Sequence, residues 1–537
     1  MKNFIACLTI IFSLSASAQS IWFDRDYYHR IDRLDQFSSV GTFSTVKPMS
    51  RQLVREMSRG KDEFLYRDNS PFSDSNRSDK PLLKWFYKNK TDLLSGRNDN
   101  YEISVRPILY FSYGRESIDN QNLTLSRNTR GVRVFGSIDN KITFSSRFTE
   151  NQVRFPGYMS EFNGGRYVIP NLGFWKRFGT DGIDYFQAAG HFAFKLTKSV
   201  TAEFGQDNHF YGNGIRSLVL SDFGNSFPYL KLTTNVGKVK YTNLFAQLTA
   251  TTFGDGLGTF GNTRFPTKYM ALHHLSVNIG SKLNIGLFES IIYHRGDSSR
   301  SDLELAYLNP LIFYRAVEQD QGSPDNAAIG FDFKWKLTKN IQTYGQLFVD
   351  EMVLSRLFDG QGWWGNKVVY QLGAKWFDFL KVQNLDIQLE YNFARPYTYA
   401  HADNLTNYTH YDQSLAHPLG ANFNEYLAVL RYKWRDKLMV TAQVMLANKG
   451  LDDSDNNFGG DIFRSYGDVA PNREIGNHQG QGVSTNIAFA TVRMSYMLRH
   501  NLFVDLTLNQ RHFGEQTKST FANLGLRLNH PFSSFIF

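Results

Sequence analysis

The chain has 537 residues, 42% hydrophobic and 15% aromatic, with one cysteine, 14 prolines and a formal net charge of +9. The aromatic content excludes intrinsic disorder, and one cysteine excludes a disulfide scaffold or a thiolate metal site. After the first few dozen positions no run of 18 apolar residues occurs, which excludes a membrane protein built from helices. Composition therefore indicates a large, aromatic-rich β protein.

The first residues have the pattern of a secretory signal peptide. Lys2 supplies the positive charge, residues 4–14 form a short apolar run, and Ala16-Ser17-Ala18 is a cleavage site. We therefore expect residues 1–18 to be removed. An exported chain is not expected to have nucleic acid as a partner.

Residues 19–100 differ from the rest of the chain and predict a small, partly helical periplasmic region. A serine N-cap starts a helix over 50–57 that Gly60 ends, and a second helix is predicted over 79–94 with Pro81 in its first turn. We expect this region to occlude the mouth of the following domain or to hold a partner. A loose linker is the alternative.

From residue 101 onward many segments alternate apolar and polar residues. Clear examples are 329–337, 385–393 and 502–508. A period of two predicts strands with one apolar and one polar face.

The connections between these strands separate into two kinds. Eight are tight turns, and long polar links of roughly 9 to 36 residues lie between them. Eight turns make sixteen strands, and one further strand at each end gives 18, so that both termini lie on the periplasmic side. The turns are Asp139-Asn140, Lys198-Ser199, Gly237, Gly280-Ser281, Lys339-Asn340, 379–384, Asp436 and His500-Asn501.

One-sided long loops are typical of bacterial outer-membrane barrels. A soluble sandwich or propeller explains neither these loops nor the C-terminal Phe532, Phe535 and Phe537, which look like the aromatic C-terminal signal of such barrels. The predicted fold is all-β, a transmembrane outer-membrane β-barrel of about 18 antiparallel strands over residues 101–537.

One segment resembles a known family. Residues 205–222 read GQDNHFYGNGIRSLVLSD, and Pro228 follows. An aromatic-Gly-x-Gly run leading into Leu-x-Leu-Ser and then a proline resembles the signature of the Wzi-type capsule assembly proteins. Tyr211 and Asn213 stand where that signature has Trp and Pro, and Asp222 stands where Asn is common.

Two further stretches, 128–151 and 309–326, look like Bacteroidota members of this family. Gliding-motility outer-membrane proteins of the RemB type look similar across the same blocks. The resemblance implies an 18-stranded outer-membrane barrel, periplasmic helices, loops folded over the opening, and a non-catalytic, lectin-like role in holding capsular polysaccharide.

The signature segment is interpreted first as a structural loop, with Gly212, Gly214, Ser221 and Asp222 as its defining residues. Glycines permit positive φ and close backbone approach, which suits a loop folded back into a lumen. A wide barrel is an open channel unless something fills it. The loops expected to fill it are 151–184, 294–326, 396–424 and 449–484.

Flat aromatic rings and arginines on loops are the candidates for sugar binding, because rings stack on C–H faces and guanidinium groups pair with acidic glycans. Outer-girdle aromatics and ion pairs inside the barrel are the alternatives. The candidates for polysaccharide binding are Trp363, Trp364, Tyr397, Tyr399, Arg216 and Arg315.

Signatures of catalysis and metal binding do not stand out. The loop with His401, His410 and His417 has no diagnostic spacing, and the calcium-like run at 453–457 lacks the expected Gly and final Glu. We expect no catalytic residues, no metal and no cofactor.

The sequence thus predicts a monomeric barrel in outer-membrane lipid that attaches or organises surface polysaccharide. Capsule export or gliding machinery are its candidate protein partners. A gliding-motility or adhesion component and a porin or uptake channel remain the alternatives.

Overall fold

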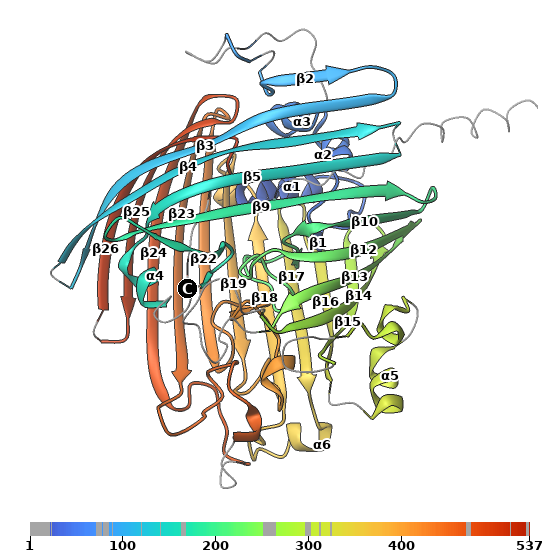
Figure 1. Cartoon of the computed structure of the whole chain (residues 1–537), viewed down its shortest axis with the longest axis vertical. Helices are drawn as coiled ribbons and strands as arrows, with labels where there is room; N and C mark the ends of the chain where they lie inside the picture. Colours follow the sequence, from blue (N-terminus) through green and yellow to red (C-terminus); the bar gives the residue numbers. More distant parts are fainter. Residues whose placement is uncertain are drawn as a thin grey trace, which may run out of the picture.

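In the computed structural model the chain forms a closed antiparallel barrel (Figure 1). The described residues are 22, 24–70, 78, 85–87, 90–119, 121–139, 141–162, 168–250, 265–295, 302–310, 313–322, 325–468, 474–515, 517–532 and 536. The predicted signal peptide lies outside them. No helix within these ranges is both long and apolar enough to span a membrane.

Within the described ranges the barrel wall has 18 strands, which confirms the predicted count. It closes where β26 pairs with β3, and the short strands β2 (Leu94–Arg97) and β8 (Lys176–Phe178) extend its edge. The wall strands are β3 (Tyr101–Ile118), β4 (Gln121–Ile138), β5 (Ile142–Arg154), β9 (Gly182–Lys195), β10 (Val200–Asp207), β12 (Phe227–Val236), β13 (Val239–Thr249), β14 (Thr267–Ile279), β15 (Leu283–Tyr293), β16 (Asn326–Lys336), β17 (Ile341–Glu351), β18 (Lys367–Trp376), β19 (Leu385–Ala394), β22 (Phe423–Trp434), β23 (Leu438–Leu451), β24 (Val483–Arg499), β25 (Leu502–Phe513) and β26 (Thr517–Leu528).

The alternating pattern turns apolar side chains outward and polar side chains into the lumen. In β19, Leu389 is 50% exposed on the outer wall, whereas its neighbour Glu390 is 4% exposed inside. This arrangement is the reverse of a soluble barrel and suits a wall surrounded by lipid.

The two ends of the barrel differ as predicted. All eight tight turns lie at one end, here called the short-turn end, and seven long connections lie at the other, the long-loop end. Two connections at the long-loop end are also short, those joining β3 to β4 and β25 to β26.

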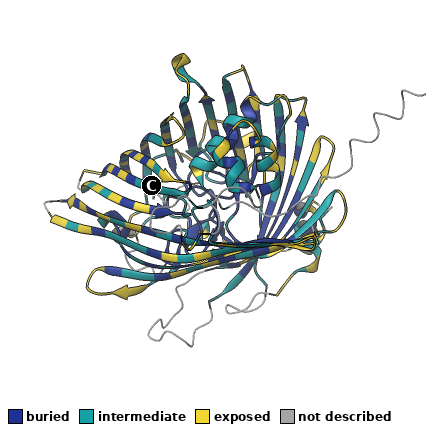
Figure 2. Ribbon diagram, turned by 90° about the horizontal axis from the view of Figure 1, so that it is seen from above, coloured by how far each residue is buried: buried dark blue, intermediate teal, exposed yellow. Residues whose placement is uncertain are grey.

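Three helices lie inside the ring of strands at the short-turn end (Figures 1 and 2). They are α1 (Arg25–Gln36), α2 (Arg51–Ser58) and α3 (Glu63–Asn69). The serine cap predicted for α2 is confirmed, because Ser50 accepts from the N–H of Leu53. The helix predicted over 79–94 is wrong in its described part, since 85–87 form a turn and β2 begins at Leu94.

Helix α1 is held to the barrel wall by charged pairs. Asp32 lies 2.6 Å from Lys375, Asp35 lies 2.7 Å from Lys334, and Arg33 lies 2.6 Å from Asp386. Because these charged groups are largely buried and paired, α1 is anchored to the neighbouring wall strands β16, β18 and β19.

A plug fills the lumen above α1. It consists of segment 42–50 and the loop 208–226, here called the signature loop, which pair through β1 (Val46–Lys47) and β11 (Phe210–Tyr211). Apolar side chains of the signature loop, Leu218 and Leu220 among them, pack against inward-facing wall residues. The lumen is therefore filled with packed side chains where the signature loop meets the barrel wall.

The described residues of the loop between β15 and β16 do not enter the lumen, so for them the expectation that 294–326 fills the barrel is wrong. Its described residues 302–310 and 313–322, here called the outer strap, include η1 (Leu305–Leu308) and α5 (Tyr314–Gln321) and lie outside the strands (Figure 1). Tyr307 and Tyr314 pack on the outer faces of β13–β15.

Polar groups on the outer wall explain this position. His273 and Glu289 are cross-strand neighbours there, 3.2 Å apart, and Tyr314 bonds to both through its hydroxyl and its backbone N–H. Tyr241 donates to the carbonyl of Pro310 at 2.6 Å. The strap satisfies polar groups that lipid would leave unpaired.

The C-terminal segment also turns into the lumen. Strand β26 ends at Leu528, the ring of Phe532 lies 4.2 Å from the guanidinium of Arg493, and the carbonyl of Ile536 accepts from Arg216 at 2.7 Å. Phe532 is thus not an outward residue of the last strand, and Phe535 and Phe537 lie outside the described residues.

Candidate functional site

The signature loop touches the barrel wall most closely at Gly214. Glu390 accepts from the backbone N–H groups of Ile215 and Arg216, at 2.6 and 3.0 Å. A Cβ at Gly214 would lie 2.5 Å from Glu390 Oε2 and 2.7 Å from Gln371 Oε1. The loop therefore requires glycine here for close approach, as predicted, although no positive φ is involved.

Arg216 anchors the loop from its other side. Its guanidinium donates to Glu425 Oε1 at 2.7 Å, and the side chain is 6% exposed. A buried guanidinium already bonded to a carboxylate and to Ile536 has little capacity left for a glycan. The structure places Arg216 as a fastener of the plug.

The end of the signature loop joins two other parts of the chain. Ser221 bonds to the carbonyl of Ala416 and receives Phe223 N–H at 3.2 Å. Asp222 pairs with Arg25 of α1 at 2.9 Å. The carboxylate that departs from the family signature thus has a cationic partner in the N-terminal region.

Tyr397 and Tyr399 lie in the loop between β19 and β22, which folds inward. They are 1% and 0% exposed, and the hydroxyl of Tyr399 donates to the carbonyl of Leu218 at 2.8 Å. Their ring faces are covered by protein. In this position they support the plug and the platform above it.

Trp363 and Trp364 form a half-buried aromatic platform at the long-loop end together with Tyr466. The rings of Trp364 and Tyr466 are 5.1 Å apart, and Lys367 Nζ lies 3.8 Å from the centre of the Tyr466 ring. These four residues are here called the outer platform. Its flat rings are of the kind that stack on a sugar, and the buried Lys367 packs against the Tyr466 ring.

Backbone bonds between two loops hold the outer platform in place. Trp364 N–H donates to the carbonyl of Glu474 at 3.0 Å, and Asn477 N–H donates to that of Gly362 at 2.9 Å. Lys367 is fixed by Glu351 at 2.8 Å. Tyr466 was not identified from the sequence, because only the tertiary pairing of the two loops brings it to the tryptophans. Lys367 follows Trp364 by three residues, and its contact with Tyr466 depends on the same pairing.

Arg315 belongs to α5 on the outer strap, on a different part of the barrel from the outer platform, and its side chain lies outside the described residues.

Within the described ranges no three metal-ligating side chains lie close enough together to hold an ion.

The model of the capsule assembly protein Wzi family matches residues 105–523. No curated protein sequence matches the chain. A structure of Wzi from Escherichia coli, an outer-membrane protein involved in group 1 capsule assembly and described as a carbohydrate-binding β-barrel, is 12% identical. The match covers 96% of this chain and 100% of that one, with a TM-score of 0.57, and shows the shared fold.

Weaker similarities extend to other barrels. OprD from Pseudomonas aeruginosa is 10% identical with a TM-score of 0.41, over 80% of this chain and 96% of that one. OccAB4 from Acinetobacter baumannii is 9% identical with a TM-score of 0.43, over 80% and 98%. These two TM-scores are too low to support a conclusion about this chain. The family model, in contrast, spans more than half of the sequence. The chain belongs to the Wzi capsule assembly family.

Proposed function

We propose that this protein is an outer-membrane barrel that attaches or organises capsular or exported polysaccharide at the cell surface, without catalysing a reaction on it. The observation that carries the proposal is the filled lumen beneath the outer platform: segment 42–50 and the signature loop occupy the interior, and the platform faces the long-loop end. A plugged barrel suits surface binding better than passage of solutes.

Membership of the family and the described character of the Escherichia coli protein support the same role. In this arrangement the long-loop end faces outward, and α1–α3 and both termini lie on the periplasmic side. Trp363 and Trp364 contact the sugar rings. Lys367 is buried and paired with Glu351, and it holds the Tyr466 ring beside them.

A deletion strain tests the role directly, with polysaccharide measured in the cell-bound and medium fractions. We expect glycan to move from cells to medium at constant total. An unchanged partition contradicts the proposal and directs attention to motility.

Complementation with Trp363→Ala/Trp364→Ala tests the outer platform. Each ring contributes about 1 kcal/mol of stacking, so the double variant is expected to bind roughly tenfold or more weakly. Trp434→Ala is the matched control, because Trp434 is a 46% exposed tryptophan at the opposite end of the barrel. If both variants retain glycan equally, the outer platform is not the binding surface.

A further inference from the structure

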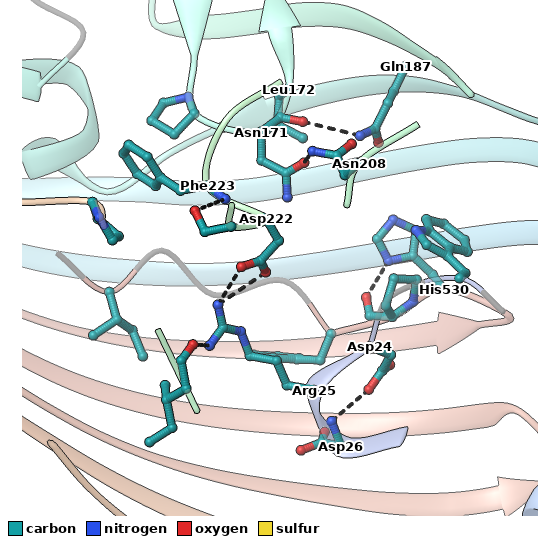
Figure 3. Close-up of a pocket in the computed structure, with 18 of the residues that line it drawn as sticks. Asp24, Arg25, Asp26, Asn171, Leu172, Gln187, Asn208, Asp222, Phe223 and His530 are labelled. Carbon is teal, nitrogen blue, oxygen red and sulfur yellow. Dashed lines mark hydrogen bonds and ion pairs between the residues drawn. The ribbon is translucent and has the colours of Figure 1, made fainter. Parts of the chain in front are cut away.

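An internal cavity of about 190 Å³ lies beside the plug, between the signature loop, the N-terminal segment, the C-terminal segment and the barrel wall. Figure 3 shows its polar lining, with the Arg25–Asp222 pair on one side and Asn171, Gln187 and Asn208 on the facing wall. Neither the family signature nor the outer platform accounts for it.

Arg431 is the unusual residue of this cavity. Its side chain is buried, and its one described hydrogen bond runs from Nη1 to Gln388 Oε1 at 3.1 Å. Its Nε–H has no partner, and no carboxylate oxygen of a described residue lies within ion-pair distance.

The carboxylates near Arg431 are already paired with other cations. Asp26 bonds to Arg493, Asp32 lies 2.6 Å from Lys375, and Asp386 lies 2.6 Å from Arg33. A buried guanidinium without its own counter-ion is costly, because burial removes its hydration and the bond to Gln388 replaces only part of it. The lack of a counter-ion therefore indicates that Arg431 binds an anion that the chain itself does not supply.

Two more arginines of the cavity leave the same group unused. Arg147 is bonded to Asp207 through its terminal nitrogens, yet its Nε–H has no partner, and the same holds for the Nε–H of Arg493. The ring of Trp22 lies 4.9 Å from the Arg147 guanidinium and offers an aromatic surface beside these donors.

The charge of the residues that line the cavity also favours an anionic ligand. Among the described residues that line the cavity, six are arginines and four are aspartates. A second cavity of about 330 Å³ at the short-turn end shares Arg431, and its described lining holds five arginines and lysines against Asp62 and Asp386. Both of these cavities thus have a basic lining, which concentrates anions.

We propose that the internal cavity binds one carboxylate-bearing sugar residue of an acidic polysaccharide. The inference rests on the proposed function and names the chemical class of its glycan. Arg431 pairs with the carboxylate, and Trp22 stacks on the ring. Asn171, Gln187 and Asn208 hold one another in place by hydrogen bonds and give the cavity a polar lining beside the hydroxyl groups. The volume is below that of drug-sized pockets and fits about one sugar unit.

Calorimetric titration of the purified full-length protein in detergent tests this site. The probes are trigalacturonate, neutral maltotriose and sodium acetate. We expect trigalacturonate to bind well above maltotriose, and Arg431→Gln to weaken it at least about 30-fold, because the variant removes the charged partner of the carboxylate. Arg511→Gln is the control, a buried arginine of the same lumen outside the cavity.

Trp22→Leu provides a second test should Arg431→Gln fail to fold: it keeps every arginine and is expected to weaken trigalacturonate binding about tenfold. Equal binding of acetate and trigalacturonate, or binding unaffected by both variants, overturns the internal site. The proposed function still stands in that case if the deletion strain releases glycan from cells to medium. Only an unchanged partition of glycan in the deletion strain contradicts the proposed function.

Discussion

Gly214 and Glu390 show how one contact fixes the signature loop. The Glu390 carboxylate receives two successive backbone N–H groups and also the hydroxyl of Tyr344 at 2.8 Å. A carboxylate can accept two successive backbone N–H groups only where the main chain lies directly against the wall strand. At position 214 only glycine, which has no Cβ, allows so close an approach.

Replacing Gly214 with alanine is expected to displace the signature loop and lower the free energy of unfolding by about 1 to 3 kcal/mol through overpacking. Gly224→Ala is the matched control in the same loop, because its nearest atom to a new Cβ is Ser414 O at 3.5 Å. Limited proteolysis and thermal unfolding in detergent measure both. Equal behaviour of the two variants would contradict the steric argument.

Burial also sets the protonation of loop histidines. It lowers the pKa of His410 to about 3 and of His401 to about 4. His410 accepts the N–H of Thr249 through Nδ1 at 3.0 Å, a bond that only the neutral ring can make. Because the unfolded side chain has a pKa near 6.5, stability is full above that pH and is lost as pH falls below it.

Acidification from pH 7.5 to 5 is therefore expected to loosen the loop between β19 and β22, by about 2 kcal/mol for His410 alone. Protease cleavage within this loop, measured against pH, reports the change. His410→Asn keeps an acceptor for Thr249 but does not titrate, and should reduce the acid sensitivity. Cleavage that does not vary with pH in the wild type would rule the mechanism out.

Single residues of the site were only partly predictable. The close approach at Gly214 was predictable because glycine in a tight motif is a local signal. Trp363 and Trp364 stay predicted binding residues, chosen because rings on a loop are also a local signal. The roles of Arg216, Tyr397 and Tyr399 depend on partners such as Glu425 and Leu218 that lie far away in sequence. Nothing near them in the sequence distinguishes a buried anchor from an exposed ligand contact.

Among elements, the strands and tight turns were predictable because alternation and turn residues are local signals. The position of the outer strap was not predictable, because the strap is held outside the barrel by a polar pair formed between two neighbouring strands. His273 and Glu289 belong to the outward parity of β14 and β15, where apolar residues are expected. Helices α1 and α3 were not predicted individually, because their small apolar cluster forms only when α1, α2 and α3 come together, with Ile31, Val54 and Leu65 in contact.

Removal of 302–322 is expected to expose His273 and Glu289 to lipid and to destabilise the barrel by about 2 kcal/mol. Adding His273→Leu and Glu289→Leu to the shortened chain should restore most of the loss. Urea unfolding in lipid vesicles compares the three proteins. If the shortened chain is as stable as the full chain, the strap does not shield the wall.

At the scale of the whole molecule, the plug predicts electrical behaviour. The full-length protein in planar bilayers is expected to conduct ions weakly, because β1 and β11 pair across the lumen. Deletion of residues 25–69 removes α1–α3 and segment 42–50 together, and should raise the conductance several-fold. A high conductance of the intact chain would favour the channel alternative.

The pairing of α1 with the wall also has a consequence for the order in which the molecule is assembled. Asp26 finds its partner Arg493 467 residues later, and other α1 contacts lie on β16, β18 and β19. None of these partners is in place until the strands have been joined, so the part of the chain that is synthesised first is fixed last. The N-terminal segment therefore stays undocked until the barrel closes, and then locks it from the short-turn end.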